Sequence, residues 1–178
     1  FSSINGYHGA KLESYDKILS FLTATERTNL DYRQLNILSM LNTKYIIRRG
    51  LNGKKIISEN KDILGSAWFV EDLRGGLSME KQLTSIPVLN HNLMAVSNYY
   101  EGNKKYLKDD FSSIDLIEKT SNYIKYKTFN NNYGFAVFSE IYYPHGWVST
   151  INGEETPHYR VNFLLRGMEI PKGEHVIE

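Results

Sequence analysis

The chain has 178 residues, 41% hydrophobic and 23% charged, which is typical of a folded globular protein and excludes a disordered one. Its 21 basic residues nearly balance its 20 acidic residues, so charge gives no reason to expect nucleic acid as a partner. The chain contains no cysteine, which excludes disulfides, thiolate metal sites and cysteine nucleophiles.

Two amphipathic helices are predicted in the first part of the chain. Between residues 12 and 22, apolar side chains recur at spacings of three and four, the pattern of a helix with one buried face: Leu12, Tyr15, Ile18, Leu19 and Leu22. A second helix is predicted over Tyr32–Leu41, where leucine recurs every third residue.

A hairpin follows these helices. Tyr45–Ile47 reads as a buried strand, and Lys55–Ser58 reads as its return strand. The intervening Asn52-Gly53 favours a tight turn, because both residue types tolerate positive φ angles. Next in the chain, Ala67–Glu71 is predicted to be a strand, and Ser78–Leu83 a short helix with Ser78 as its N-cap.

From residue 113 onward the pattern is that of β-strands. Turn signals at Asn152-Gly153 and Pro171-Lys172-Gly173 separate some of them. Short strands spaced by turns at roughly 8–12 residues favour an antiparallel sandwich. The predicted strands are Ile114–Lys119, Asn122–Phe129, Phe135–Glu140, Trp147–Ile151, Tyr159–Ile170 and His175–Ile177.

These patterns together predict an α+β fold, with a helical N-terminal section packed on an antiparallel β-sandwich of jelly-roll or Ig-like type. We expect residues 1–110 to form an α/β section and residues 111–178 the sandwich, joined into one compact unit. Strand patterning continues to Glu178, so we expect the chain to be part of a longer protein. Its apolar runs are far shorter than the ~20 residues that span a bilayer.

Four aromatic residues, Trp147, Tyr142, Tyr143 and Trp68, form the candidate binding site. Indole and phenol rings stack well on the C–H faces of sugars, so an exposed platform of these residues predicts glycan binding. The alternative is that they pack in the core. Neither a cofactor nor a metal site is predicted.

Charged and histidine residues give weaker signals for chemistry. Glu140 is interpreted as the partner of Arg160 or Arg166 in a partly buried ion pair; the alternative is a general acid, which in glycoside hydrolysis needs a second carboxylate. His8 could act as a general base or a sugar-binding donor, or cap the following helix, and His145 with His158 match no known metal spacing. No catalytic residue is predicted.

Several phrases resemble successive landmarks of the YfhO-like bacterial membrane proteins, in the order of that family and over nearly the whole chain. They are residues Tyr7–Leu12, Leu38–Ile47, Leu64–Val70, Ala136–Trp147, Ile151–Gly153 and Tyr159–Phe163.

The resemblance implies a polytopic membrane protein similar to glycosyltransferases that use lipid-linked sugars, with this chain as its soluble extracytoplasmic domain. The implied location is the outer side of the cytoplasmic membrane, and a composition rich in Asn, Tyr, Lys and Ile suggests a Gram-negative source, which would make this compartment periplasmic. The implied partners are the transmembrane part of the same polypeptide and a glycan or cell-envelope polymer. The domain would position an acceptor or brace the membrane part without catalysing a reaction. The alternatives are a carbohydrate-binding module with its own glycan affinity, a free-standing glycosidase-like enzyme, or a purely structural domain.

Overall fold

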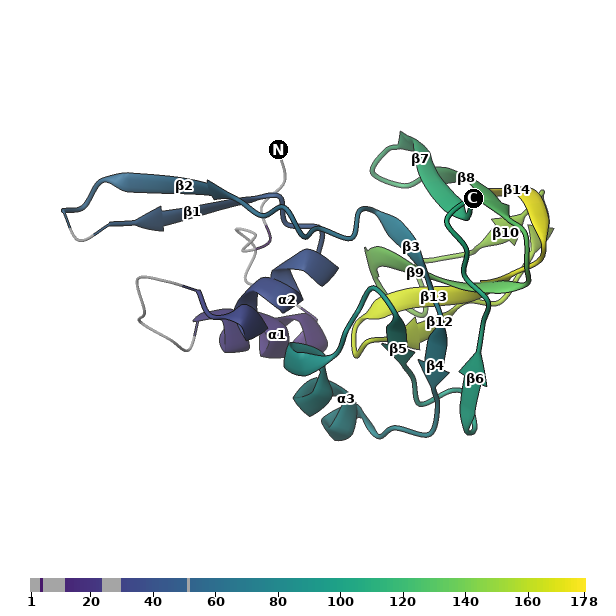
Figure 1. Cartoon of the computed structure of the whole chain (residues 1–178), viewed down its shortest axis with the longest axis horizontal. Coiled ribbons are helices and arrows are strands. Elements are labelled where there is room, and N and C mark those ends of the chain that lie inside the picture. The colour runs from purple at the N-terminus through teal and green to yellow at the C-terminus, as the bar shows by residue number, and fades with distance from the viewer. Residues whose placement is uncertain (1–3, 5–11, 24–29, 51) are drawn as a thin grey trace.

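The computed structural model describes residue 4 and residues 12–23, 30–50 and 52–178, and it shows a β-rich α+β fold (Figure 1). His8 and most of the first family-like phrase lie outside the described residues. Both predicted N-terminal helices are present, as α1 (Glu13–Thr23) and α2 (Tyr32–Met40). A capping box starts α2: the Asp31 carboxylate accepts from backbone N–H groups, and the Gln34 side chain accepts from the N–H of Asp31.

Strands β1 (Tyr45–Arg49) and β2 (Lys55–Glu59) form the predicted hairpin as a two-stranded sheet of their own. The turn has its positive φ at Gly53. The prediction of a buried strand over Tyr45–Ile47 is wrong, because Tyr45 and Ile47 are 50% and 64% exposed. A strand is buried only when another layer covers it, and this hairpin extends away from the rest of the protein (Figure 1).

A four-stranded antiparallel sheet forms one layer of the β region, in the order β12-β13-β9-β3. Its β3 belongs to the first of the two predicted sections but pairs with β9 of the second, so the sheet crosses that division. The strands are β3 (Ala67–Val70), β9 (Gly134–Ile141), β12 (Tyr159–Val161) and β13 (Leu165–Ile170).

The predicted single strand Tyr159–Ile170 is wrong, because it is divided between β12 and β13. Asn162 and Phe163 both have positive φ, at 47° and 70°. Tertiary hydrogen bonds hold this turn: the Gln82 side chain accepts from the Phe163 N–H at 3.0 Å, and the Asn162 side chain accepts from the Val96 N–H at 3.0 Å.

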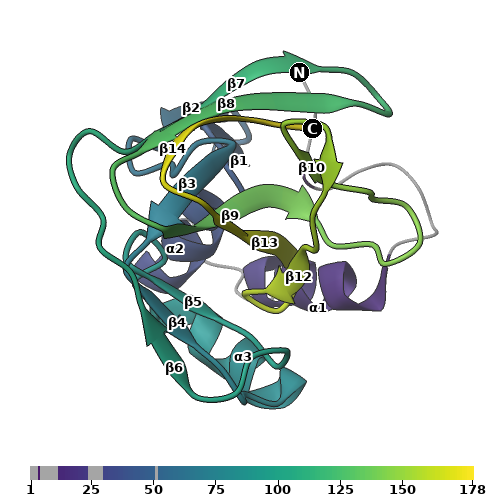
Figure 2. The ribbon, with the colours of Figure 1, turned by 90° about the vertical axis from the view of Figure 1, so that its right-hand side faces the viewer.

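A second, five-stranded antiparallel sheet has the order β11-β10-β14-β8-β7, and Figure 2 shows β7 and β8 above β9 and β13 of the first sheet. The predicted strand Trp147–Ile151 is shorter than expected, since only its last two residues pair in β10. The strands are β7 (Ser113–Lys119), β8 (Ile124–Asn130), β10 (Thr150–Ile151), β11 (Glu154–Glu155) and β14 (Gly173–Ile177).

A small three-stranded sheet, β5-β4-β6, lies beside α3 and below the larger sheets in the view of Figure 1. It comprises β4 (Asp72–Arg74), β5 (Met94–Val96), parallel to β4, and β6 (Asn103–Lys105). The predicted helix is present as α3 (Met79–Ser85) with Ser78 as its N-cap, followed by the 3₁₀ helix η1 (Ile86–Val88).

Two apolar clusters hold these parts together. The first joins α1 and α2 to the outer face of the four-stranded sheet, with Phe135 and Leu165 fully buried. The second fills the space between the two larger sheets, around Tyr126, Phe138 and Met168. No helix among the described residues is long and apolar enough to cross a membrane.

Candidate functional site

The two tryptophans of the predicted platform lie in different environments. Trp68 on β3 is only 7% exposed, and its indole N–H donates to the carbonyl of His91 at 2.7 Å, so it presents no face to a ligand. Trp147 is half-buried, and its indole N–H donates to the carbonyl of Ile141 at 3.1 Å. The structure therefore does not bring the two indoles together on one surface.

The two predicted tyrosines follow β9 and also separate from one another. Tyr143 is 46% exposed and packs edge-on near His145, with ring centroids 6.1 Å apart. Tyr142 is half-buried and turns toward Tyr99, at 6.4 Å between centroids. Tyr142 is thus the member of the predicted platform that joins a larger aromatic surface.

That surface is a row of four tyrosines, Tyr142, Tyr99, Tyr159 and Tyr100, which we call the tyrosine row. Ring centroids are 5.9 Å apart between Tyr99 and Tyr159, and 5.0 Å apart between Tyr159 and Tyr100. Tyr100 continues edge-on to the buried ring of Phe135 at 5.8 Å, which anchors the row to the core. Because Tyr99 is 49% exposed and the other three are half-buried, the row presents ring surface to solvent.

The carboxylate of Glu169, on β13, lies beside this row and is held by three donors. Lys104 Nζ, the Tyr106 hydroxyl and the Tyr133 hydroxyl each lie 2.9 Å from its oxygens. Burial acts to raise the pKa of Glu169, but these hydrogen bonds outweigh burial and leave the pKa below its ordinary value. Glu169 is therefore an ionised hydrogen-bond acceptor at neutral pH. Lys104 also lies 4.7 Å from the centre of the Tyr100 ring, which joins the carboxylate to the row.

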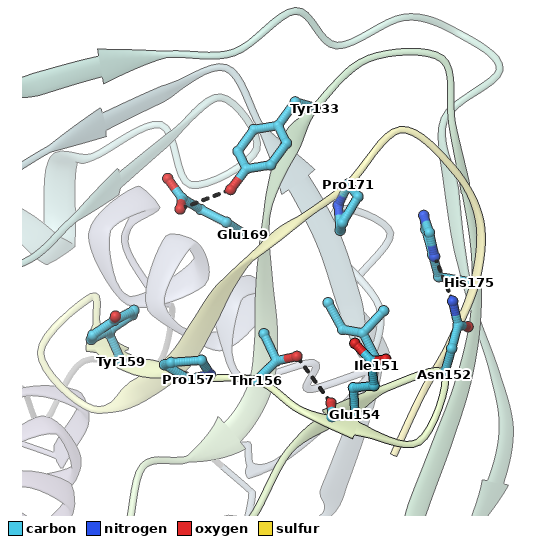
Figure 3. A pocket seen from close by; sticks show the side chains of 10 residues that line it. All are labelled: Tyr133, Ile151, Asn152, Glu154, Thr156, Pro157, Tyr159, Glu169, Pro171 and His175. Carbon is cyan, nitrogen blue, oxygen red and sulfur yellow. Dashed lines mark hydrogen bonds between the residues drawn. The ribbon is translucent and has the colours of Figure 1, made fainter.

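An open pocket of about 500 Å³ begins at Tyr159, the third member of the tyrosine row, on the β10–β14 side of the sheets (Figure 3). Tyr133 and Glu169 lie at one side of the pocket, and their hydrogen bond is visible in Figure 3. Burial, and next the bond to Glu169, raise the pKa of Tyr133 to about 12, so its hydroxyl stays protonated. Pro157 and Pro171 add C–H surface, and Glu154 and Thr156 add polar groups.

The opposite wall of the pocket carries a fixed amide–imidazole pair. Asn152 Nδ2 lies 2.9 Å from His175 Nδ1, while His175 Nε2 lies 3.2 Å from the carbonyl of Lys172. An amide N–H₂ donates and a carbonyl accepts, so these contacts place the imidazole proton on Nε2. Asn152 owes its position to the β10–β11 turn, where it and Gly153 both adopt positive φ.

The predicted ion pair of Glu140 is present, with Arg166 as its partner. Arg166 Nη2 lies 3.2 Å from Glu140 Oε2, and the two side chains are 8% and 6% exposed. Both residues lie in the four-stranded sheet, on β13 and β9. Tyr126 of the five-stranded sheet donates to Glu140 Oε1 at 2.7 Å, and Lys119 approaches the same oxygen at 3.4 Å. The carboxylate thus connects the two sheets.

Trp147 covers this ion pair from the solvent side. Its ring centre lies 4.2 Å from the Arg166 guanidinium, which also donates to the Ser149 hydroxyl at 3.2 Å. Ser149 in turn lies 2.9 Å from His158 Nδ1. Burial, and next the charge of Arg166, lower the pKa of His158 to about 4, so its ring is neutral at pH 7. A cavity of about 270 Å³ opens beside these groups.

The geometry supports ligand binding more than chemistry. Within the described part of the chain, no group of three or more histidine and acidic side chains could hold a metal ion. The donors around Glu169 stabilise its ionised form, and Glu140 is enclosed by Arg166, Tyr126 and Lys119. What remains accessible is aromatic surface, C–H surface and hydrogen-bonding groups.

Sequence reasoning missed most of this surface. Tyr99 and Tyr100 lie in a polar stretch whose sequence predicts neither helix nor strand. Two adjacent tyrosines in such a stretch were the one sequence signal for an aromatic surface there. Glu169 was a second sequence signal, because it is the one acidic residue in the β13 sequence LRGMEI. Neither signal shows that residues 99, 142 and 159 meet, because only the pairing of sheets brings them together.

Comparison with protein-family models, with curated proteins and with solved structures gives no match for this chain. The resemblance to the YfhO-like proteins therefore stays a prediction from the sequence.

Proposed function

We propose that this chain is a non-catalytic glycan-binding domain, in which the tyrosine row and the pocket beside Glu169 hold a segment of oligosaccharide. Of the roles that the sequence leaves open, glycan binding agrees best with the geometry. The observation that carries the proposal is the continuity of the site: the row runs from Tyr142 to Tyr159, and the pocket starts at Tyr159.

The chemistry of the surface matches that of a sugar chain. Pyranose rings have apolar C–H faces and a rim of hydroxyl groups, so they favour aromatic rings bordered by fixed acceptors and donors. Ring surface comes here from Tyr99 and Tyr159. Glu169 and Asn152 lie at the pocket with their own hydrogen bonds already formed, so little ordering is needed when a sugar binds.

The surroundings of the two enclosed carboxylates, Glu169 and Glu140, favour glycan binding without hydrolysis. A general acid needs a raised pKa so that it holds its proton at neutral pH. The donors around Glu169 lower its pKa instead. Glu140 is enclosed by Arg166, Tyr126 and Lys119, which leaves it without access to a glycosidic oxygen.

We propose further that the domain belongs to the extracytoplasmic, periplasmic part of a YfhO-like polytopic membrane protein and positions an acceptor glycan there. The ordered family-like phrases support this context. The two larger sheets, which share a core, support a β-sandwich for residues 113–178 together with β3. Deleting the domain from the full-length protein tests the role: unchanged glycosylation and unchanged assembly would argue against it.

Binding is tested by screening the isolated chain against neutral and N-acetylated oligosaccharides and measuring the best ligand by titration calorimetry. Tyr99→Ala removes the ring between Tyr142 and Tyr159, and we expect about ten-fold weaker binding. Tyr99→Phe keeps the ring and should bind like the wild type. Tyr32→Ala is the matched control, because Tyr32 is 63% exposed on α2.

Two results would overturn the proposal. The first is a wild-type chain that binds no oligosaccharide in the screen. The second is a Tyr32→Ala variant that loses as much affinity as Tyr99→Ala.

A further inference from the structure

The hairpin formed by β1 and β2 has one face that no residue of the described part of the chain covers. It extends from the body as an arm beyond α2 (Figure 1). The register places Tyr45 opposite Glu59, Ile47 opposite Ile57, and Arg49 opposite Lys55, and directly opposed residues share one face of a sheet. All six are exposed, and Ile57, at 67%, is more exposed than its partner Ile47. We call this surface the arm face.

The arm is fixed at its base. Asn60, only 6% exposed, donates through its side chain to Ser39 Oγ on α2 at 3.1 Å and to the carbonyl of Thr43 at 3.2 Å. Its backbone N–H donates to the carbonyl of Lys44 at 2.8 Å. Two-stranded hairpins are at best marginally stable alone in water. This hairpin is fixed at its base and exposes isoleucine side chains to solvent. We therefore expect its apolar face to dock on another surface.

Charge indicates what covers it. Residues 44–59 contain five basic residues and one acidic residue, a net charge of +4, whereas the whole chain has +1, so the remainder carries −3. Arg49 lies directly opposite Lys55, an arrangement of like charges that is unfavourable unless an anion lies between or above them. At the base, the Lys44 ammonium lies over the ring of Tyr45, 5.4 Å from its centre. The same Lys44 ammonium lies 3.6 Å from the Glu59 carboxylate, so the positive charge at the base is balanced, whereas Arg49 and Lys55 put two cations at the turn end of the arm face.

We propose that the arm face docks on the surface of an anionic phospholipid bilayer. The isoleucine pair and the ring of Tyr45 enter the interfacial region, and Arg49 and Lys55 contact lipid phosphates. Tyrosine and basic side chains favour the headgroup region, where rings meet apolar chains and cations meet anionic lipid. The inference does not depend on glycan binding, because the arm shares no residue with that site.

The test is sedimentation of the purified chain with phosphatidylcholine vesicles, with and without one third phosphatidylglycerol. We expect binding to the anionic vesicles alone, and its loss in about 0.5 M salt, where charges are screened within a few ångströms. Each cation near an anionic surface contributes about five-fold to partitioning, so Arg49→Glu with Lys55→Glu should weaken binding at least about twenty-fold. Ile47→Ser with Ile57→Ser should weaken it several-fold at unchanged charge.

The matched control is Lys81→Glu with Lys172→Glu, two exposed residues outside the arm whose reversal changes the net charge equally. This variant should bind like the wild type. Absence of wild-type binding, equal binding to neutral vesicles, or an equal loss in the control would each overturn the proposal. So would a concentration-dependent dimer that the serine variant abolishes without any vesicle binding, since the arm face would then bind a second copy. Unchanged melting temperatures confirm that the variants fold.

Discussion

The buried pair of Glu140 and Arg166 allows a sharp prediction about stability. Glu140→Gln keeps the shape of the side chain but removes one charge of a pair whose members are 6% and 8% exposed. The guanidinium of Arg166 is then left in the protein interior without its carboxylate. The Ser149 hydroxyl and the Trp147 ring remain beside the guanidinium, but neither carries a negative charge, and its Nε atom has no hydrogen-bond partner.

Breaking a buried pair by removing one partner costs about 3–5 kcal/mol. We expect the lower end, about 3 kcal/mol, because glutamine still offers an oxygen to Tyr126 and because Lys119 is half exposed to water. For a chain of 178 residues, 1 kcal/mol lowers the melting temperature by about 2–4 °C, so the expected decrease is about 10 °C.

The assay is thermal and urea unfolding of three variants. Glu174→Gln is the control, because Glu174 pairs with Lys127 at 3.4 Å on the surface and should lose less than about 1 kcal/mol. Glu140→Gln combined with Arg166→Met should recover most of the loss, since methionine carries no charge and packs well against the Trp147 ring. A single Glu140→Gln variant as stable as the control would refute the reasoning, and so would a double variant less stable than the single one.

Two further predictions concern the pH dependence of stability and the packing of the sheets. The folded-state pKa of His158, about 4, lies below its ordinary value of 6.5, so the unfolded chain binds more protons between these values and stability decreases as the pH falls from 6.5 toward 4. His158→Gln should therefore reduce the slope of the urea midpoint against pH in that window, while His145→Gln, at an exposed site, should keep the wild-type slope. Gly167→Ala places a Cβ 2.7 Å from the buried Phe135 ring and should destabilise the protein by about 1–3 kcal/mol, measured by urea unfolding; a neutral effect would show that the Phe135 ring can move aside and would contradict tight packing at this point.

Much of the local structure follows from short sequence signals. The capping residues before α2 and α3, and the glycine turns of both hairpins, act within a few residues of chain, so their effect does not depend on distant contacts. Strand β8 likewise alternates between buried residues and more exposed ones, which is the local pattern of a strand with one covered face. The ion pair of Glu140 was predicted from the sequence with Arg160 or Arg166 as its partner, and the structure selects Arg166.

Tertiary structure decided the rest, because the deciding contacts join residues far apart in the chain. The break between β12 and β13 depends on Gln82, some 80 residues earlier, and the burial of Trp68 depends on the carbonyl of His91. The tyrosine row is built from three separate segments that no local pattern connects. The exposure of the arm face has the same origin, since its apolar residues are typical of a buried strand and only the absence of a covering layer within the described fold leaves them in solvent. Local signals choose helix, strand or turn, whereas burial and proximity are properties of the assembled layers.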